Sequence, residues 1–300
     1  MKIGVVTVTY NSSAVLDDFF KSIESQDHSD FLLYVVDNAS TDDTISKVEK
    51  WNFKSKTLLK NKNNLGVAAA NNQGIKLALK ADCDFVMLLN NDTVFEDSLL
   101  SKLIRSYHIY GSSILVPKMN YFSPSNTIWY AGGFYNRKKA FLNFHRGQGE
   151  IDYNQYNEND TVEYAPTCCA LIHQSVFVDV GLMDEKYFVY FDDTDFFYRV
   201  LAHGKHEARY IHDIHFLHKI GSLTLSRNEN KPQKYGDFFI QQNSKNHVYF
   251  LRKQKTWSAH INLVYLWFYL TLRFFISNRF EKKWRVFYLI QLSYFKGFKI

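Results

Sequence analysis

Cysteine is scarce in this chain of 300 residues, which contains three: Cys83, Cys168 and Cys169. The adjacent pair has neither the spacing of zinc ligands nor that of a redox motif, and an odd number does not form a complete disulfide framework. This usage favours a reducing compartment and predicts a cytoplasmic protein.

Long apolar runs are also missing. Residues 1–11 hold one lysine and no small-residue cleavage site, so they predict a buried strand and not a signal peptide. Residues 263–272 are an uncharged apolar run of ten residues, about half of the ~20 that a helix needs to cross a bilayer. The chain has no internal repeat and no low-complexity linker. Its length and 46% hydrophobic content allow a large core, in one domain with an appendage or in two smaller domains.

Acidic side chains are nearly absent from the end of the chain. Residues 251–300 carry ten Lys or Arg and one acid, Glu281, which gives a charge of +9 against −3 for the first 250 residues. Two aromatic runs, 263–272 and 286–295, have basic flanks, as is typical of helices on an anionic membrane surface. We therefore expect residues 255–300 to contact a membrane surface.

The composition of this tail allows two other interpretations. A helical hairpin could pack on the rest of the chain or form a homodimer, with its basic residues solvated. Nucleic-acid binding is disfavoured, because the basic residues are interleaved with apolar runs and follow no known reading motif.

The first half of the chain alternates short apolar runs with helix-like segments, which predicts an α/β fold with a parallel sheet covered by helices. The expected strands are 2–9, 31–37, 57–60 and 85–89, and the expected helices are 14–25, 41–51, 66–80 and 97–110. Residues 120–163 predict loops or short antiparallel strands. A polar stretch, 228–233, predicts a boundary before a helical, aromatic and basic tail.

Polar residues follow the three clearest strands, and their tips are Thr9-Tyr10-Asn11, Asp37-Asn38 and Asn90-Asn91-Asp92. In open α/β sheets ligands bind beyond the carboxyl ends of strands, so we expect these tips to converge on one site. Asp37 suits a contact to a base or ribose. Ser40 could instead cap the next helix, with Asp43 completing a capping box.

A glycine turn joins a strand to a helix at residues 63–74. Gly66 allows close backbone approach, and the helix terminus after it offers free N–H groups to a diphosphate or ribose. The alternative is an ordinary turn before a small-residue helix that packs on the sheet.

Asp92 stands where a buried strand ends, a position suited to holding a divalent cation. Oxygen ligands favour Mg²⁺ or Mn²⁺, which need only one or two protein carboxylates. The alternative is a simple Asn-Asn-Asp turn. His212, His215 and His218 recur every third residue, but in an extended segment His215 points away from the other two, so a three-histidine zinc site is not expected. We expect His218 to reach the ion of Asp92.

The segment Phe188–Arg199 places three carboxylates among aromatic rings, where crowding raises carboxylate pKa values. It predicts a helix start, whose dipole favours acids in the first turn. Asp195 and Arg199 are spaced for a structural ion pair. Asp193 points elsewhere and is the candidate catalytic base.

These residues, in this order, resemble the family-two inverting glycosyltransferases of the GT-A fold, in particular a rhamnosyltransferase-like branch that builds bacterial surface polysaccharides. The resemblance runs through 5–11, 36–44, 64–74, 85–93, 177–199 and 216–222. It implies a mixed, mostly parallel sheet flanked by helices, with a Rossmann-like nucleotide half. The implied catalytic domain is 1–227, divided into a nucleotide-sugar half, 1–119, and an acceptor half, 120–227. Residues 228–300 would form a helical appendage.

The resemblance also implies roles for single residues. Asp193 matches the base, and Asp92 and His218 match the ligands of Mg²⁺ or Mn²⁺. The implied donor site is Thr9, Tyr10, Asn11, Asp37, Asn38, Asn64, Gly66, Asn71, Asn90, Asn91 and Asp92, and the implied acceptor or sugar pocket is Trp129, Gly132, Gly133 and Asp192. There are departures: Asn90 replaces an acid, Asp192 replaces a glutamate, and Thr167-Cys168-Cys169 stands where relatives have a Gly-Ala pair.

The implied reaction is direct displacement of one sugar from a nucleoside diphosphate, with dTDP-rhamnose as the first expected donor and a UDP-sugar as the second. The acceptor would be a saccharide or a lipid-linked saccharide at the inner face of the cytoplasmic membrane, with the enzyme bound peripherally. A sugar nucleotidyltransferase is a competing function, but it should have a Gly-rich basic loop after the first strand, where this chain has Thr-Tyr-Asn-Ser-Ser. A non-catalytic scaffold that binds nucleotide sugars is the other alternative.

Overall fold

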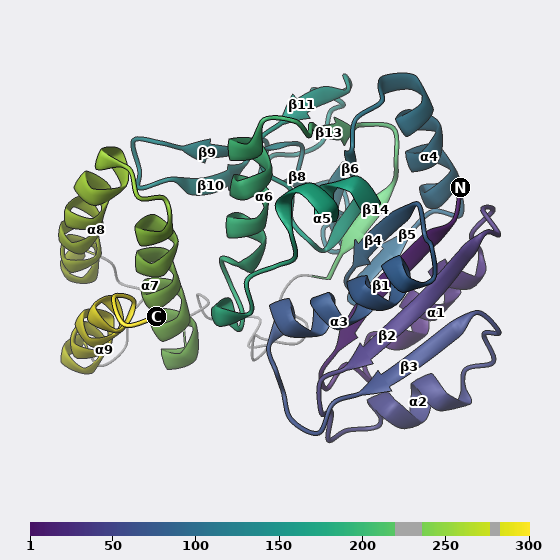
Figure 1. Ribbon diagram of the computed structural model, residues 1–300, viewed down its shortest axis with the longest axis horizontal. Coiled ribbons are helices and arrows are strands. Elements are labelled where there is room, and N and C mark those ends of the chain that lie inside the picture. The colour runs from purple at the N-terminus through teal and green to yellow at the C-terminus, as the bar shows by residue number, and fades with distance from the viewer. Residues whose placement is uncertain (220–235, 277–282) are drawn as a thin grey trace.

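A mixed eight-stranded sheet forms the centre of the protein. The computed structural model describes residues 1–219, 236–276 and 283–300. The strand order is β11-β13-β6-β12-β4-β1-β2-β3, and four of the seven neighbouring pairs are parallel. The strands are β1 Ile3–Thr9, β2 Phe31–Asp37, β3 Lys56–Lys60, β4 Phe85–Leu89, β6 Ile114–Pro117, β11 Asp160–Val162, β12 Cys169–His173 and β13 Ala208–Ile211. The expected α/β fold is confirmed (Figure 1).

Helices connect and cover these strands. They are α1 Leu16–Glu24, α2 Thr44–Lys50, α3 Val67–Lys80, α4 Leu99–Tyr110, α5 Gln174–Val180 and α6 Asp192–His203, with a short 3₁₀ turn at Glu185–Tyr187. Small residues let α3 lie close to β1: a Cβ on Gly74 would come within 2.3 Å of Val6, and one on Gly4 within 2.3 Å of Ala78. The predicted strands and helices of the first half are therefore confirmed, with ends that move by up to three residues.

A smaller sheet has the order β5-β14-β7-β8, and a hairpin is made by β9 and β10. Their bounds are β5 Thr93–Phe95, β7 Met119–Tyr121, β8 Ile128–Tyr130, β9 Gly133–Asn136, β10 Leu142–His145 and β14 Phe216–His218. The short antiparallel strands expected in 120–163 are present. The expectation of one extended segment through His212 is wrong, because His212 lies in a turn and β14 starts only at Phe216.

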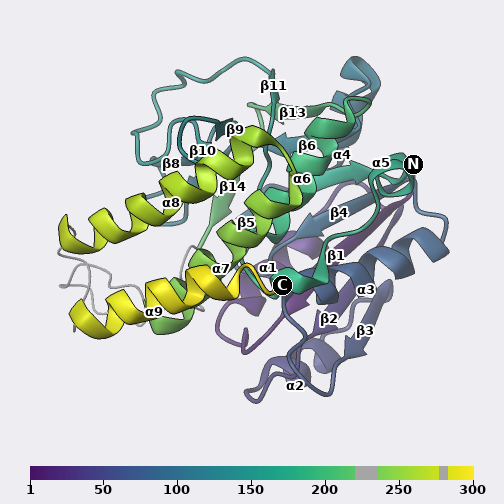
Figure 2. The same cartoon turned by 60° about the vertical axis from the view of Figure 1, so that its left-hand side comes forward.

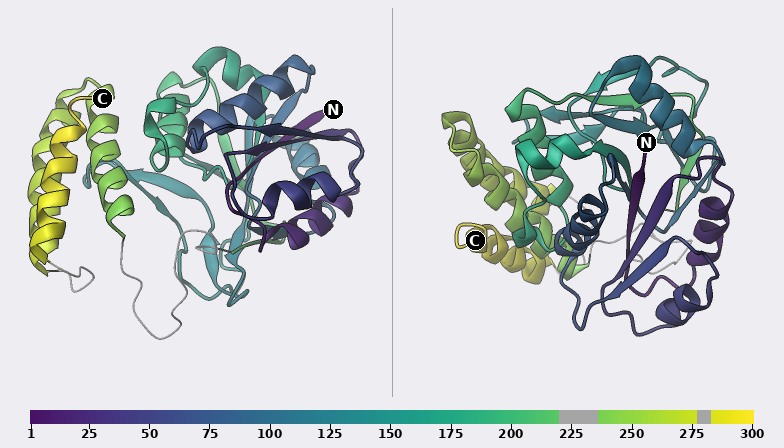
Figure 3. Two further views of the ribbon diagram at one scale, coloured as in Figure 1. Left: turned by 90° about the horizontal axis from the view of Figure 1, so that it is seen from below. Right: turned by 45° about the vertical axis from the view of Figure 1, so that its right-hand side comes forward.

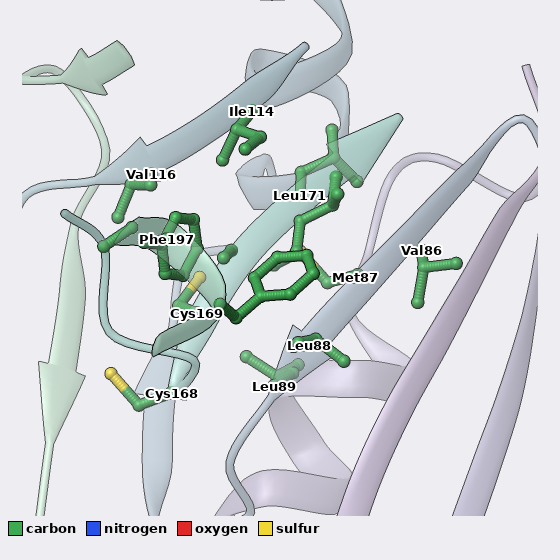
Figure 4. Packing of buried hydrophobic residues seen from close by; sticks show 14 of the residues in the cluster. Val86, Met87, Leu88, Leu89, Ile114, Val116, Cys168, Cys169, Leu171 and Phe197 are labelled. Carbon is green, nitrogen blue, oxygen red and sulfur yellow. The ribbon is translucent and has the colours of Figure 1, made fainter. Parts of the chain in front are cut away.

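The core lies between the large sheet and its helices. Figure 4 shows Leu88 and Leu89 of β4, Leu171 of β12 and Phe197 of α6 gathered over the sheet, next to Cys169. These side chains are at most 2% exposed, so α6, β4 and β12 all contribute to the core. The three cysteines are buried free thiols.

Three helices form the end of the chain: α7 Asp237–Lys253, α8 Trp257–Ile276 and α9 Lys283–Lys296. Figures 1 and 2 show them gathered on one side of the large sheet, and Figure 3 shows them side by side in a view from below. The expected helical tail is confirmed. None of the described helices combines the length and hydropathy of a membrane span.

Helix α7 packs against the rest of the protein. Its residues Val248, Phe250 and Leu251 belong to the same buried cluster as the side chains of the large sheet. The expected boundary at 228–233 lies outside the described residues, as do the positions 220–222 of the resembling segment 216–222.

Candidate active site

The tips of β1, β2 and β4 meet, as expected for adjacent parallel strands. The hydroxyl of Thr9 donates to Oδ2 of Asp37 at 2.9 Å, and the amide of Asn91 donates to the carbonyl of Val8 at 2.6 Å. Asp37 is fully buried. Its carboxylate also accepts hydrogen bonds from the backbone N–H and hydroxyl of Ser40.

The predicted capping role of Ser40 is wrong. Helix α2 begins after Asp43, which makes no side-chain cap. The hydroxyl of Ser40 instead donates to Asp37 at 2.5 Å and accepts from the backbone N–H of Asn11 at 2.9 Å. Ser40 therefore joins the tips of β1 and β2, while Tyr10 and Asn11 stay exposed at the rim.

An amide network holds the glycine turn against the tip of β2. The amide of Asn38 donates to Oδ1 of Asn64 at 2.9 Å and to the carbonyl of Gly66 at 3.0 Å. Gly66 has a φ of +87°, and a Cβ on it would lie 2.3 Å from the carbonyl oxygen of Phe188. Only glycine fits this close approach. Asn71 is buried in the helix that follows.

Asp92 and His218 lie together, with Nε2 of His218 3.3 Å from Oδ1 of Asp92. Both are buried, and Nδ1 of His218 has no hydrogen-bond partner in the described part of the chain. Adjacent octahedral ligands at about 2.1 Å from Mg²⁺ or Mn²⁺ are about 3 Å apart, so this pair fits such an ion. Over the described ranges no group of three or more His, Cys, Asp or Glu gathers as a metal cage. An ion here would take its other ligands from water or substrate.

Asp193 lies at the start of α6 and is half-buried. Its Oδ2 accepts from the hydroxyl of Tyr164 at 2.6 Å, and its Oδ1 accepts from the backbone N–H of Thr194 at 2.6 Å. Burial raises the pKa of Asp193 in spite of these bonds. Burial, followed by the charge of Asp193, raises the pKa of the neighbouring Asp192 to about 8.

The expected ion pair of Asp195 with Arg199 is confirmed, at 2.9 Å. The carboxylates of α6 therefore differ in role: Asp195 is held by a cation, whereas Asp193 is bonded by a hydroxyl and a backbone N–H.

A wall of aromatic rings connects the Asp92 side of the site to the Asp193 side. Trp129 lies 4.6 Å from His218 and 4.7 Å from His145, measured between ring centroids. His145 stacks on Tyr164 at 5.7 Å. Burial lowers the pKa of His145 to about 4, so it is neutral at pH 7.

Gly132 and Gly133, which follow Trp129 in the sequence, allow the segments of this aromatic wall to pack closely. A Cβ on Gly133 would come within 2.4 Å of the carbonyl oxygen of Tyr164. Gly132 has a φ of +112° and packs against Arg146. The sequence patterns did not single out Tyr164 or His145, because a lone tyrosine and a lone histidine in a segment of poor periodicity give no signal.

Cys168 lies near both Asp92 and Asp193. Its carbonyl accepts from the backbone N–H of Asn90 at 2.9 Å. Burial raises the pKa of its thiol, and the neighbouring Cys169 and the charges of both Asp92 and Asp193 raise it further. The residues brought together are thus the tips of β1, β2 and β4, the Gly66 turn, His218, Trp129 and Asp193.

This fold recurs among solved structures. The crystal structure of Staphylococcus aureus TarS 1–349 superposes with a TM-score of 0.56 over 99% of this chain and 81% of that one, at 17% identity. The mannosyltransferase PcManGT from Pyrobaculum calidifontis, in complex with GDP-Man and Mn²⁺, gives 0.55 over 99% and 86%, at 14% identity. These likenesses concern the fold, which is of the GT-A type.

Sequence comparison adds two bacterial relatives. One is the GalNAc(5)-diNAcBac-PP-undecaprenol beta-1,3-glucosyltransferase of Campylobacter jejuni, 27% identical over 40% of this chain and 40% of that protein. The other is the poly(ribitol-phosphate) beta-N-acetylglucosaminyltransferase TarS of S. aureus, 30% identical over 40% of this chain and 21% of its own length. The matches therefore span less than half of each relative.

The family model described as glycosyl transferase family 2 matches residues 4–181, more than half of the chain. That range contains the three strand tips, the Gly66 turn, Asp92 and the aromatic wall up to Tyr164. The chain belongs to glycosyl transferase family 2.

Proposed function

We propose that this protein is an inverting glycosyltransferase that moves one sugar from a nucleoside diphosphate to a saccharide or lipid-linked acceptor in bacterial surface polysaccharide synthesis. Family membership supports the reaction class. The observation that carries the mechanism is the environment of Asp193, a half-buried carboxylate that accepts from Tyr164 and Thr194. The ring of Tyr164 continues through His145 and Trp129 to His218, beside Asp92.

Asp193 acts as the general base in this proposal. It takes the proton of the acceptor hydroxyl while that oxygen bonds to the anomeric carbon. The bond from that carbon to the diphosphate breaks on the opposite face, the diphosphate leaves with the electron pair, and the configuration inverts. The bonds from Tyr164 and Thr194 hold the carboxylate in place for this step.

Asp92 and His218 would hold Mg²⁺ or Mn²⁺. Such an ion, when bound, neutralises charge that develops on the departing diphosphate. Two solved structures of similar fold, GalNAc-T7 with UDP, GalNAc and Mn²⁺ and PcManGT with GDP-Man and Mn²⁺, support this choice of ion. Asn90 and Asn91, on the same turn as Asp92, would contribute amide groups to donor binding.

The donor side is formed by the strand tips and the Gly66 turn. Thr9, Asp37 and Asn38 would line the nucleoside pocket, with Tyr10 and Asn11 at its rim, and Asn64, Gly66 and Asn71 would lie near the ribose or base. The rhamnosyltransferase-like motifs favour dTDP-rhamnose. The names of the relatives and a TarS structure in complex with UDP-GlcNAc favour a UDP-hexose as the second candidate.

The sugar pocket would lie along the aromatic wall. Trp129, Gly132 and Gly133 border it on one side, and Asp192 lies next to the base on the other. In this division residues 1–119 bind the donor, 120–227 bind the acceptor, and 228–300 attach the enzyme to the membrane.

Helices α8 and α9 support membrane attachment. Their exposed apolar residues recur every three or four positions, so each helix presents one apolar face. These residues are Trp257, Ile261, Val264, Tyr265, Phe268, Leu272, Phe275 and Ile276 on α8, and Trp284, Tyr288 and Phe295 on α9. Exposed Lys296 and Lys299 follow. We place the protein peripherally at the inner face of the cytoplasmic membrane.

A product assay tests the proposed function. The purified chain is incubated with dTDP-rhamnose, UDP-glucose or UDP-GlcNAc and Mn²⁺, with and without a lipid-linked saccharide pool from bacterial membranes. Release of dTDP or UDP with an inverted sugar linkage is the expected result. Formation of dTTP or UTP and a sugar 1-phosphate when pyrophosphate is added would instead make it a nucleotidyltransferase, and binding of the donors without any product would make it a scaffold.

A further inference from the structure

The turn that carries the proposed base has an unusual backbone. Phe188, Tyr190 and Phe191 have φ values of +34°, +64° and +68°, a region that bulky residues rarely adopt. Helix α6 begins directly after Phe191, whose side chain provides no cap. A turn of this kind persists only where its surroundings hold it. The position of Asp193, two residues later, therefore depends on what contacts this turn.

Asn246, in the middle of α7, contacts this turn. It is fully buried, and its amide donates to the carbonyl of Val189 at 2.9 Å and to that of Tyr190 at 2.8 Å. Its Oδ1 has no hydrogen-bond partner among the described residues, so the amide serves the turn as a double donor. The next residue of α7, His247, stacks on Phe191 with ring centroids 4.9 Å apart.

Lys253, at the end of α7, holds the first turn of α6. Its Nζ lies 2.7 Å from Oδ1 of Asp195 and 2.7 Å from Oδ2 of Asp184. The hydroxyl of Tyr187 also donates to Asp195 Oδ1, at 3.1 Å. Lys253 thus ties together the segments before and after the turn.

The start of helix α3, on the proposed donor side of the site, contacts the same turn. The backbone N–H of Val67, the first residue of α3, donates to the carbonyl of Phe188 at 2.5 Å. The turn thus contacts the helix after the donor-binding glycine on one side and α7 on the other.

We infer that Asn246 and Lys253 are positioning residues, through which helix α7 sets the location of the Asp193 carboxylate. This inference rests on the proposed role of Asp193 as the base. It makes α7 part of the catalytic machinery, whereas α8 and α9 serve attachment. Both residues act through their bonds to the turn and to α6, so the expected effect is on turnover and not on donor affinity.

The main test replaces Asn246 with leucine, which keeps the volume and removes both hydrogen bonds. Asn243→Leu is the matched control, because Asn243 lies one turn earlier on α7 and its amide donates to the carbonyl of Phe239 in the same helix. A base displaced by about 1 Å loses roughly 100-fold in rate. We expect Asn246→Leu to lower kcat by 10- to 100-fold, as a rough range, with the Kd for UDP or dTDP within about twofold of wild type.

A double variant separates positioning from a general loss of structure. If Asn246 acts through Asp193, adding Asn246→Leu to Asp193→Asn lowers the residual rate no further. A further loss by the same factor as in the wild-type background would overturn the inference. So would a kcat for Asn246→Leu equal to that of Asn243→Leu.

Lys253 gives a second test if the Asn246 variant fails to fold. Lys253→Met is compared with Lys205→Met, which removes a lysine that pairs with Asp179 on the surface. We expect a kcat loss of roughly tenfold only for Lys253→Met, and equal rates would count against the inference.

A fully active Asp193→Asn would refute the base itself, whereas an inactive Asp193→Asn beside active α7 variants would refute only the positioning role.

Discussion

The hydroxyl of Tyr164 donates a 2.6 Å hydrogen bond to Oδ2 of Asp193. Hydrogen bonds to a carboxylate favour its ionised form, and this one opposes the effect of burial on the pKa of Asp193. The tyrosine thus holds the pKa of the base below the level that burial alone would set, in addition to fixing the direction of the carboxylate.

Removing this hydroxyl tests that relationship. Tyr164→Phe should raise the pKa of Asp193. The acid limb of the plot of kcat against pH should then move to higher pH by about one to two units, the equivalent of one charge-assisted hydrogen bond. The control is Tyr135→Phe, since Tyr135 donates to the backbone carbonyl of Thr194 and not to the carboxylate. An acid limb that stays in place in Tyr164→Phe would contradict the assignment of this limb to Asp193.

The two adjacent carboxylates should respond differently to substitution. Asp193→Asn should lose about 10²- to 10⁴-fold in kcat, the usual contribution of a general base, and keep its affinity for UDP or dTDP. Asp192 has a pKa raised to about 8, so it is protonated at pH 7 and resembles asparagine. Asp192→Asn should therefore retain most of the activity at pH 7, and a loss equal to that of Asp193→Asn would show that the pair shares the base function.

Asp192 should also make stability depend on pH. Its pKa rises from a usual 3.8 to about 8 in the folded protein, so between these values the folded state holds a proton that the unfolded state has released. Stability then falls as the pH rises through this range. Thermal unfolding of wild type and Asp192→Asn at pH 5, 6, 7 and 8 should show a Tm difference that grows with pH in favour of the variant. A constant difference would mean that burial does not shift this carboxyl.

Sequence periodicity was enough to predict that the tips of β1, β2 and β4 meet. The tips at Thr9, Asp37 and Asp92 follow buried apolar strands, and adjacent parallel strands bring their ends together whatever the rest of the chain does. The surroundings of Asp193 could not be predicted in this way. Tyr164 reaches it from 29 positions away, and no local spacing encodes such a contact.

Asn246 was equally beyond prediction. It contacts the carbonyls of Val189 and Tyr190 across more than 50 positions, from a tail whose composition favoured a membrane surface and named no contact with this turn. The sequence of the turn did not predict its backbone conformation, because its residues with positive φ are aromatic and not glycine. Tertiary contacts determine this backbone, and local propensity opposes it.

Metal removal gives the next prediction. In the presence of UDP, Mn²⁺ should raise the Tm of the wild type by mass action, and Asp92→Ala and His218→Ala should lose most of that shift. EDTA should abolish transfer, and added Mn²⁺ should restore it. The control is Asp152→Ala, because the carboxylate of Asp152 pairs with Lys118, whereas that of Asp92 lies beside His218. Normal transfer by both EDTA-treated enzyme and Asp92→Ala would exclude a metal requirement.

The last prediction concerns the exposed faces of α8 and α9. A Phe268→Ser and Leu272→Ser double variant should reduce flotation with anionic liposomes, because the two side chains are 54% and 58% exposed and face away from the protein. Each large apolar side chain contributes about 1.5–3 kcal/mol when it is fully buried, so losing two should weaken partitioning at least tenfold, as a rough lower bound. The fold should keep its stability because neither residue packs in the core.

The comparison that decides this point uses Tyr153→Ser, which removes an aromatic ring that is 76% exposed in the catalytic part of the chain. This control should float as the wild type does. Raising the salt concentration should weaken wild-type flotation, since exposed Lys296 and Lys299 would interact with anionic headgroups through a screened field. If the α8 variant floats as well as the control at both salt concentrations, the apolar face is not the anchor, and analytical ultracentrifugation should then show a dimer that the α8 variant no longer forms.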